Sequence, residues 1–411
     1  MNIWKNFLII TLLIFVTCEE DKVDTNPFEQ EHIEWPSLAD SPWPTFRHDY
    51  QGTGRFEGVG PSSTNYEILY EPDVGINRGS VSIGHNNHVV FNTTCKLTYI
   101  DLEGNLLWEA DMCEYLSVSS AESYHAPIIT SDSTIIICSW DKHIYCFDEG
   151  TGDKIWDYDV GHLIDNTPLL GLDGTVYLSS DSGTFAIDKD GLLKWRKNQI
   201  IYPSAFSPNG LQIYGIREGE FSLVAMDLTG NIVWENNLFR TGYFVVDNDG
   251  NIYGANHLEK TILSVNENGN LRWSISVENI SSEYEIRGTE GVSPTLDVFG
   301  RLNYIISDYE NNSHLIRITV EGEIEQKIEL NVRGFGTPLV SDISGTTYIA
   351  SFFGGDSTRY KVIGIDSDGE VVMEVANGNY GYYGCPAFTN EGYLIYLPSW
   401  QEIPMKLKVY K

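Results

Sequence analysis

A short pattern that recurs seven times along the chain constrains its fold more than any other feature. A typical copy has an apolar pair, an Asp or an equivalent residue, a Gly three or four positions later, and an apolar or Trp position four beyond that Gly, and the last two copies are degenerate. The copies follow one another at intervals of roughly 40 to 50 residues, which marks a structural repeat. They are Asp101–Gly104–Trp108, Asp148–Gly152–Trp156, Asp188–Gly191–Trp195, Asp227–Gly230–Trp234, Asn266–Gly269–Trp273, Thr319–Gly322–Gln326 and Asp366–Gly369–Met373.

The chemistry of this unit predicts a β-hairpin. Asp followed by Gly is typical of a tight turn, because the Asp side chain caps backbone amides and the Gly adopts positive φ. Such a turn joins two antiparallel strands, and the Trp on the second of them buries a large ring between neighbouring units. A four-stranded unit cannot bury both faces of its sheet alone, so the units must stack around an axis. A period near 40 residues with four short strands predicts a β-propeller.

The other strands of each blade can be followed in the sequence. Alternating runs such as Thr175 to Leu178 recur, whereas no stretch shows sustained helical periodicity. The 38 Gly, 24 Tyr and 10 Trp also suit short strands and tight turns. An inner strand is expected to begin near a Pro in five blades, at Pro127, Pro168, Pro294, Pro338 and Pro386.

The two ends of the chain predict how the ring closes. Three strands follow Met373, near Pro386, over Tyr393 to Leu397 and over Lys406 to Tyr410, but no fourth. Residues Tyr66 to Val74 form an isolated strand before any first strand. Together they complete one blade and leave no exposed edge. We therefore predict an all-β, eight-bladed propeller of four-stranded antiparallel blades closed by the N-terminal strand, with seven blades as the alternative.

The repeat resembles that of PQQ-like propellers, whose blades carry a fourth-strand Trp after an Asp-to-Gly turn. Residues Trp43 to Asp49 and Thr53 to Arg55 are similar to the segment that often precedes these propellers. The resemblance covers residues 43–411 and supports the fold far more than a function, because propellers host many unrelated activities. The blade number and the leader also resemble those of non-enzymatic envelope lipoprotein propellers.

The first residues are typical of a targeting segment. Lys5 provides a positive charge, Phe7 to Thr17 form an apolar run of signal-peptide length, and Glu19 to Asp21 end it. Cys18 lies where bacterial lipoprotein signals place their lipidated cysteine, although Phe15 to Thr17 depart from the usual residues. We predict a signal peptide over 1–17, a lipid anchor at Cys18, an acidic linker over 18–42 and a propeller over 43–411. The alternatives are a simple secretory signal or an uncleaved anchor.

The charge of the chain excludes one class of partner. With 26 Lys and Arg against 58 Asp and Glu, the formal net charge is -32. Such a surface repels a phosphate backbone, so nucleic acid is not an expected partner. The expected location is the outer membrane, on its periplasmic or cell-surface face, with the membrane contacted through the lipid anchor by a monomeric propeller.

The sequence offers no catalytic or metal-binding constellation, so we predict no cofactor and no metal. Quinone-dependent dehydrogenases of this fold carry a vicinal cysteine pair, and no two cysteines here are adjacent. The repeated Asp residues are explained by turn capping. The segment Asp247 to Asn251 resembles the start of a calcium loop but lacks the later acidic ligand. The nine His are scattered, and His85 and His88 flank a predicted turn.

Five cysteines follow Cys18, and an odd number implies at least one free thiol. Cys95 is expected in the turn between the second and third strands, and Cys113 just after the Trp108 strand. These two positions share one face of an up-down blade, so the pair is a candidate disulfide. Cys138 and Cys146 are expected to be buried as small apolar residues, and nothing in the sequence assigns Cys385.

Basic and aromatic residues gather where each blade leads into the next. We interpret them as a collar at the mouth of the channel, suited to an acidic or extended partner. The simpler alternative is that the arginines pair with local carboxylates and the tyrosines pack between blades. The collar candidates are Arg78, Arg240, Arg287, Arg333, His125, Tyr202 and Tyr382.

These features favour a non-enzymatic, lipid-anchored envelope propeller that binds a protein or glycan partner as a scaffold. The first alternative is a PQQ-dependent oxidoreductase, which the repeat resemblance suggests. The second alternative is a surface protein that binds polysaccharide.

Overall fold

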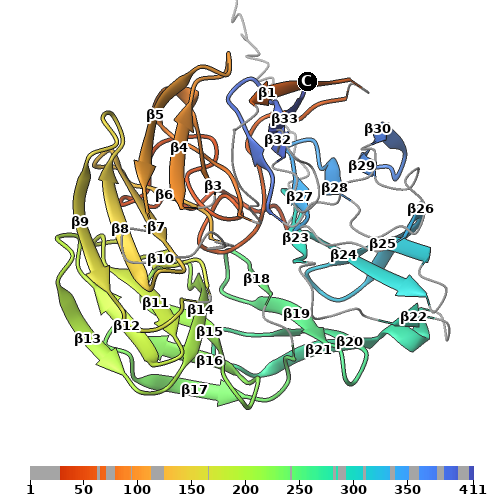
Figure 1. Cartoon of the computed structure of the whole chain (residues 1–411). Helices are drawn as coiled ribbons and strands as arrows, with labels where there is room; N and C mark the ends of the chain where they lie inside the picture. Colours follow the sequence, from red (N-terminus) through yellow and green to blue (C-terminus); the bar gives the residue numbers. More distant parts are fainter. Residues whose placement is uncertain are drawn as a thin grey trace, which may run out of the picture.

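The computed structural model of the chain shows eight antiparallel sheets arranged as blades in a ring (Figure 1). It describes residues 28–62, 65–70, 79–93, 95–112, 125–164, 166–240, 243–280, 284–285, 293–308, 312–333, 338–350, 361–376, 384–396 and 407–411. Seven of the sheets have four strands and one has five. The predicted eight-bladed β-propeller is confirmed.

The first four blades follow the order of the chain. Blade 1 consists of β2 (Ser82–Ile83), β3 (Val89–Thr93), β4 (Lys96–Ile100) and β5 (Leu106–Asp111), with the 3-10 turn η1 (His85–Asn87) after β2. Blade 2 consists of β6 (Ile128–Ile129), β7 (Thr134–Cys138), β8 (His143–Asp148) and β9 (Lys154–Asp159). Blade 3 has β10 (Leu169–Leu170), β11 (Val176–Ser180), β12 (Gly183–Ile187) and β13 (Leu193–Lys197), and blade 4 has β14 (Ile201–Phe206), β15 (Gln212–Arg217), β16 (Leu223–Asp227) and β17 (Ile232–Asn236).

Blades 5 to 7 continue the pattern. Blade 5 consists of β18 (Val245–Val246), β19 (Ile252–Asn256), β20 (Thr261–Val265) and β21 (Leu271–Ser276), followed by the 3-10 turn η2 (Val277–Asn279). Blade 6 has β23 (Thr295–Leu296), β24 (Arg301–Asp308), β25 (Asn312–Thr319) and β26 (Ile324–Arg333), and the extra strand β22 (Tyr284–Glu285) pairs with the far end of β24. Blade 7 has β27 (Val340–Ser341), β28 (Thr347–Ala350), β29 (Lys361–Ile365) and β30 (Val371–Ala376).

Blade 8 joins the two ends of the described chain. It consists of β31 (Ala387–Phe388), β32 (Leu394–Tyr396) and β33 (Leu407–Tyr410), and its outer strand is β1 (Tyr66–Tyr70). Strands β1 and β33 are antiparallel, with Tyr66 opposite Tyr410 and Glu67 opposite Val409 (Figure 1). The predicted closure by a strand from near the N-terminus is confirmed.

The repeated Asp residues cap the turns between the third and fourth strands, as the sequence predicts. In blade 4, one carboxylate oxygen of Asp227 accepts hydrogen bonds from the amides of Thr229 and Asn231, both at 2.9 Å. Gly230 closes the turn with a φ of 79°, where a side chain would be strained. Asp101, Asp188, Asn266 and Asp366 each accept the same two amide hydrogen bonds.

Each repeated Trp joins its blade to the next one. The indole N–H of Trp195 in blade 3 donates to the carbonyl of Leu228 in blade 4 at 2.9 Å. Its ring lies so close to Gly230 that a Cβ on that Gly would approach the ring to 2.9 Å. The turn therefore needs Gly both for its backbone angle and for the space that the ring occupies. Trp108, Trp156, Trp234 and Trp273 make the same contacts with the following blade.

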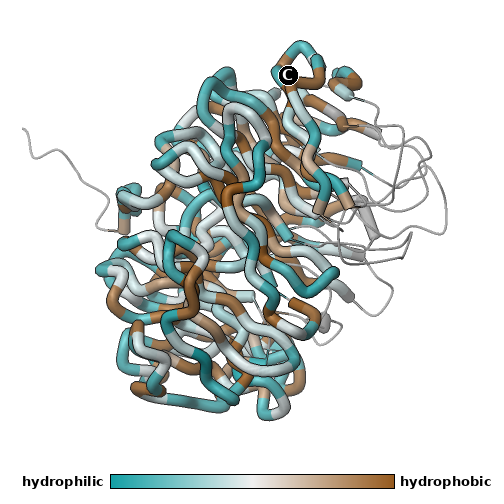
Figure 2. The backbone as a smooth tube through the Cα atoms, turned by 60° about the vertical axis from the view of Figure 1, so that its left-hand side comes forward, coloured by the Kyte–Doolittle hydropathy of each residue, from teal (hydrophilic) through white to brown (hydrophobic). Residues whose placement is uncertain are grey.

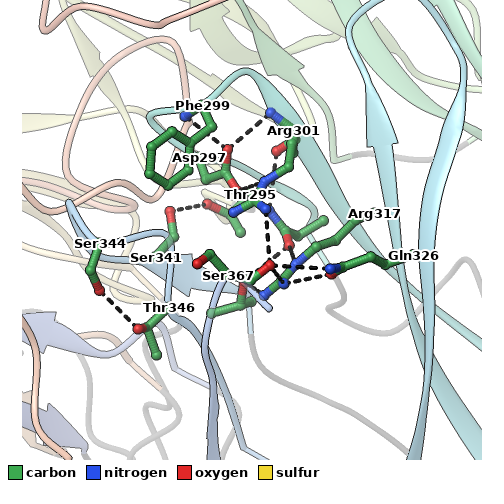
Figure 3. A network of polar contacts seen from close by, with 12 residues as sticks. Thr295, Asp297, Phe299, Arg301, Arg317, Gln326, Ser341, Ser344, Thr346 and Ser367 are labelled. Carbon is green, nitrogen blue, oxygen red and sulfur yellow. Dashed lines mark hydrogen bonds and ion pairs between the residues drawn. The ribbon is translucent and has the colours of Figure 1, made fainter. Parts of the chain in front are cut away.

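The junction between blades 6 and 7 uses polar side chains in place of a Trp. Gln326 occupies the repeat position, and its side-chain amide donates to the Ser367 carbonyl, which is equivalent to the carbonyls that the indoles bind (Figure 3). The buried Arg317 donates to the same carbonyl at 2.9 Å and to that of Ile365 at 3.1 Å. The degenerate copy of the repeat thus keeps the cross-blade hydrogen bond and loses the aromatic contact.

The core lies between the blades and around the axis. All residues of β11 and β12 are buried, whereas the outer strand β13 alternates between exposed and partly buried residues. Figure 2 shows hydrophobic stretches along the strands and hydrophilic residues at many of the turns. This pattern is expected for blades that cover both faces of every inner strand by stacking.

The segment before β1 crosses the centre of the ring and touches all eight blades (Figure 1). Its backbone makes hydrogen bonds with the inner strands of six blades, at Ile83, Ile129, Phe206, Val246, Leu296 and Ser341. The Trp35 indole donates to the Leu170 carbonyl of blade 3 at 2.7 Å, and Phe56 stacks on Phe388 of blade 8 at 4.5 Å between ring centroids. We call residues 28–58 the axial segment.

The axial segment changes the domain boundary inferred from the sequence. Trp35 and Leu38, which the sequence places in an acidic linker, are buried in the hydrophobic core. Farther along the segment, the buried Asp49 accepts a hydrogen bond from the Thr53 amide at 2.9 Å. The described residues 28–42 therefore belong to the propeller.

Candidate functional site

The strand order gives the ring two chemically different faces. Turns from first to second strand and from third to fourth strand lie at one end of every blade, which we call the turn face. Turns from second to third strand and the connections between blades lie at the other end, which we call the connection face. The predicted collar belongs to the connection face.

Arg240 lies on this face between blades 4 and 5. Its Nη1 donates to the Glu220 carbonyl at 3.0 Å, and its backbone amide donates to the Ala255 carbonyl at 3.1 Å. Arg240 is partly exposed, and its guanidinium is anchored to main chain.

Tyr202 and His125 occupy different environments. Tyr202 lies in β14, is partly exposed, and donates its hydroxyl to Glu218 Oε1 at 3.4 Å. The His125 ring is buried, with Nε2 3.0 Å from the Ile164 carbonyl, and burial lowers its pKa to about 4. His125 therefore stabilises the connection between blades 2 and 3 as a neutral ring and is inaccessible to a partner.

The remaining collar candidates cannot be placed together. Arg78, Arg287 and Tyr382 lie outside the described residues, as does Cys18. Arg333 is the last residue of β26, where the structure describes the backbone but not the side chain. The collar as a complete ring stays a prediction.

Two apolar residues that the sequence analysis missed lie beside Arg240. Phe221 in the turn of blade 4 is 56% exposed, and Leu258 in the corresponding turn of blade 5 is 68% exposed. Phe221 also has a φ of 53°, an unusual value for a residue with a side chain. The sequence signal for both residues was a large apolar side chain in a polar turn, directly after Glu220 in one case and after His257 in the other.

Hydrogen bonds of Arg240 link the turns that carry these residues. Its guanidinium contacts Glu220, the neighbour of Phe221, and its carbonyl contacts the ring of His257, the neighbour of Leu258. We call Tyr202, Phe221, Arg240 and Leu258 the blade 4–5 surface.

The composition of this surface suits recognition of another molecule. Aromatic and Arg side chains are enriched at protein interfaces, and Tyr202, Phe221 and Arg240 are of these types. Glu218 and Glu220 lie at its edge, where charges would set the orientation of a partner.

The acidic and His residues of the described ranges are the candidates for metal ligands. Across the described ranges, no three His, Cys, Asp or Glu residues are grouped so that they could hold a metal. The carboxylate of Asp247 accepts hydrogen bonds from the amides of Asp249 and Asn251 and from the Tyr253 hydroxyl. Turn formation thus explains the segment that resembles a calcium loop.

The cysteines divide into two groups. Cys95 is disulfide-bonded, and its predicted partner Cys113 lies outside the described residues. Met112 donates its amide to the Cys95 carbonyl at 2.8 Å, so the strand that leads to position 113 runs beside Cys95. Cys138, Cys146 and Cys385 are buried thiols outside any disulfide, and burial raises the pKa of Cys146 to about 11 and of Cys385 to about 12. Such thiols are unreactive near neutral pH.

Within the described part of the chain, no helix has the length and apolar character needed to cross a bilayer.

Comparison with known proteins supports the repeat type. The profile of the family described as "Outer membrane protein assembly factor BamB" matches residues 96–238, from β4 to just beyond β17. No curated protein matches the chain.

Solved structures share the fold at low sequence identity. The quinohemoprotein alcohol dehydrogenase from Comamonas testosteroni is 12% identical, with a TM-score of 0.66 over 93% of this chain and 82% of that one. A europium-containing methanol dehydrogenase is 11% identical, with a TM-score of 0.65 over 88% of this chain and 90% of that one. BamB from Moraxella catarrhalis is 19% identical, with a TM-score of 0.44 over 72% and 88%. At these identities the likeness concerns the fold.

Proposed function

We propose that this chain, a β-propeller of PQQ-like repeats, is a lipid-anchored, non-enzymatic protein of the cell envelope that binds a partner. The partner is a protein or a glycan that approaches the connection face. The predicted leader and Cys18 provide the anchor, and the ring provides a rigid platform.

The blade 4–5 surface is the observation that carries this proposal. Phe221 and Leu258 expose large apolar side chains on turns, and Arg240 donates hydrogen bonds to the main-chain carbonyls of Glu220 and Ala255. Residues fixed in this way lose little conformational freedom on binding, which favours affinity. Aromatic and Arg side chains are also the residue types that dominate interface energies.

A binding test follows directly. We expect the Phe221→Ser, Arg240→Ala and Leu258→Ser variants of the full-length chain to capture at least about tenfold less partner from cross-linked envelopes than the wild type. Leu172→Ser removes an exposed leucine from the turn face and serves as the matched control. Equal capture by all variants would contradict a role for the blade 4–5 surface, and retention on a glycan array would identify a polysaccharide partner.

The alternative is a PQQ-dependent oxidoreductase, which the likeness in fold to the two dehydrogenases favours. The same full-length protein can be mixed with the quinone and calcium and examined by absorbance and equilibrium dialysis. We expect no stoichiometric complex, because the repeated carboxylates cap turn amides. A one-to-one complex with dye-linked alcohol oxidation would replace the proposed function by the alternative.

A further inference from the structure

We infer that the turn face of the propeller lies against the lipid bilayer and that the blade 4–5 surface faces away from it. The inference rests on the lipid anchor of the proposed function and adds the orientation of the molecule, the lipid class that the face tolerates, and the contact residues. Two independent observations carry it, namely the place where the chain enters the ring and the apolar side chains around that face.

The chain enters the ring on the turn face. Gln30 donates its amide to the carbonyl of Val298, in the first turn of blade 6, at 2.9 Å. Glu31 donates its amide to the Asn248 side chain, in the first turn of blade 5, at 3.0 Å, and Asn248 donates back to the Glu31 carbonyl at 3.0 Å. These bonds fix the direction from which the leader arrives.

The tether between this point and the anchor is short. Nine residues lie between Cys18 and Phe28, and the ten residue steps of a fully extended chain span at most about 36 Å. The residues that follow Phe28 do not lengthen it, because Trp35, Trp43 and Phe56 are buried in the ring. The turn face is therefore the part of the propeller that the anchor holds nearest to the membrane.

A rim of aliphatic side chains surrounds the same face. Each outer strand begins at the turn face, and on six successive blades an exposed apolar residue lies two or three positions after the turn Gly. These residues are Leu107, Ile155, Leu193, Val233, Leu271 and Ile324. Such a circle of aliphatic groups suits shallow contact with the boundary between lipid headgroups and acyl chains.

The charges near this rim indicate neutral lipids. Lys189 pairs with Asp190 at 3.2 Å, Lys194 with Asp173 at 3.1 Å, and Arg272 with Glu321 at 3.3 Å. Basic side chains that are already paired do not attract anionic headgroups, and the net charge of -32 repels them. We therefore expect contact with zwitterionic lipid, driven by the aliphatic groups.

Site-specific quenching tests the orientation with the full-length, lipidated protein in phosphatidylcholine vesicles. Leu193→Cys places a dye on the rim, and Leu258→Cys places one on the connection face as the matched control. Of the cysteines in the described residues, Cys138, Cys146 and Cys385 are buried and Cys95 is bonded, so these do not compete for the dye. We expect brominated acyl chains to reduce the emission of the dye at position 193 by about twofold and to leave that at position 258 unchanged.

The outcomes separate the inference from the proposed function. Flotation with the vesicles but equal quenching at both positions, or stronger quenching at position 258, would overturn the orientation and leave the anchor in place. A chain that does not float would remove the anchor and the inference together. Ile155→Cys repeats the test on another blade, so one misfolded variant does not decide the result. Increased quenching with phosphatidylglycerol would contradict the preference for neutral lipid.

Discussion

The Trp of each repeat performs two tasks whose partners lie in the next blade. Trp195 donates to the Leu228 carbonyl and covers Gly230, so one side chain fixes both a hydrogen bond and a packing contact. The sequence predicts that such a Trp is buried between units, because its position after the turn is regular. It cannot predict that Gln326 replaces the indole as a donor, because the acceptor at Ser367 is 41 residues away in the chain.

Separating the two tasks gives a residue-scale prediction. Trp195→Phe keeps a ring over Gly230 and removes the N–H donor, so we expect the free energy of unfolding to fall by about 1 kcal/mol. Trp195→Ala removes the ring as well and should cost about 2–4 kcal/mol. Denaturant unfolding of the purified variants measures both. Leu192→Ala, at an exposed position in the preceding turn, should change stability by less than about 0.5 kcal/mol.

His125 predicts sensitivity to mild acid. Burial lowers its pKa to about 4 in the folded protein, whereas an unfolded chain has a value near 6.5. Between these values the unfolded state binds a proton that the folded state does not, so stability falls as the pH drops from about 6.5 to about 4. The loss is on the order of 3 kcal/mol.

Unfolding curves between pH 7 and 4 would measure this slope, and we expect His125→Gln to reduce it. The stability of the His125→Gln variant at pH 7 does not test this prediction, because a substitution in the core can also change packing. An unchanged slope in the variant would show that His125 is not the group that titrates.

At the scale of elements, the blades were predictable and the axial segment was not. Strand positions follow from alternation, Pro and Asp-to-Gly turns, and each of the five Pro-marked inner strands begins within two residues of its Pro. The axial segment shows neither the alternation of a strand nor the spacing of the repeat, because its backbone pairs with six different strands in succession. Its buried residues Trp35 and Leu38 stand among acidic ones, so local composition indicated a linker. The blade 4–5 surface was missed in part for a similar reason, since Phe221 and Leu258 are isolated in polar turns.

The axial segment predicts a second, more acidic transition. Burial alone would raise the pKa of Asp49, but the adjacent His48, the charge of Arg55 and hydrogen bonds from Thr53 lower it to about 2. The carboxylate therefore stabilises the fold above pH 4, and this contribution, about 2 kcal/mol, is lost as the pH falls from about 4 to about 2.

Acid unfolding of Asp49→Asn measures the contribution. We expect the variant to be less stable than the wild type at pH 7 and to lose less stability between pH 4 and 2. Asp190→Asn, which alters an exposed carboxylate on blade 3, is the control and should follow the wild-type curve. A parallel acid response of the Asp49 variant and the wild type would contradict the assignment.

At the scale of the molecule, the ring depends on pairing between its two ends. Strand β33 lies between β32 and β1, so removing residues 407–411 would leave β32 without its outer neighbour and β1 without any partner. Unpaired edges of this kind promote aggregation. We expect the truncated chain to elute as oligomers in size-exclusion chromatography and to be cleaved at least about tenfold faster by protease.

Removing Lys411 alone is the control, because its side chain makes an exposed ion pair with Glu67 that contributes little. If the longer truncation behaved like the control, closure by β1 and β33 would not be needed for stability.

The pairing of β1 with β33 also makes closure of the ring depend on synthesis of both strands. A chain that emerges N-terminus first releases β1 early and must hold it unpaired until β33 is synthesised. A premature stop before β33 yields a product with an open ring and an exposed strand that quality-control proteases can recognise. Only a chain that contains both β1 and β33 reaches the closed state, so the position of two short strands links the integrity of the message to survival of the protein.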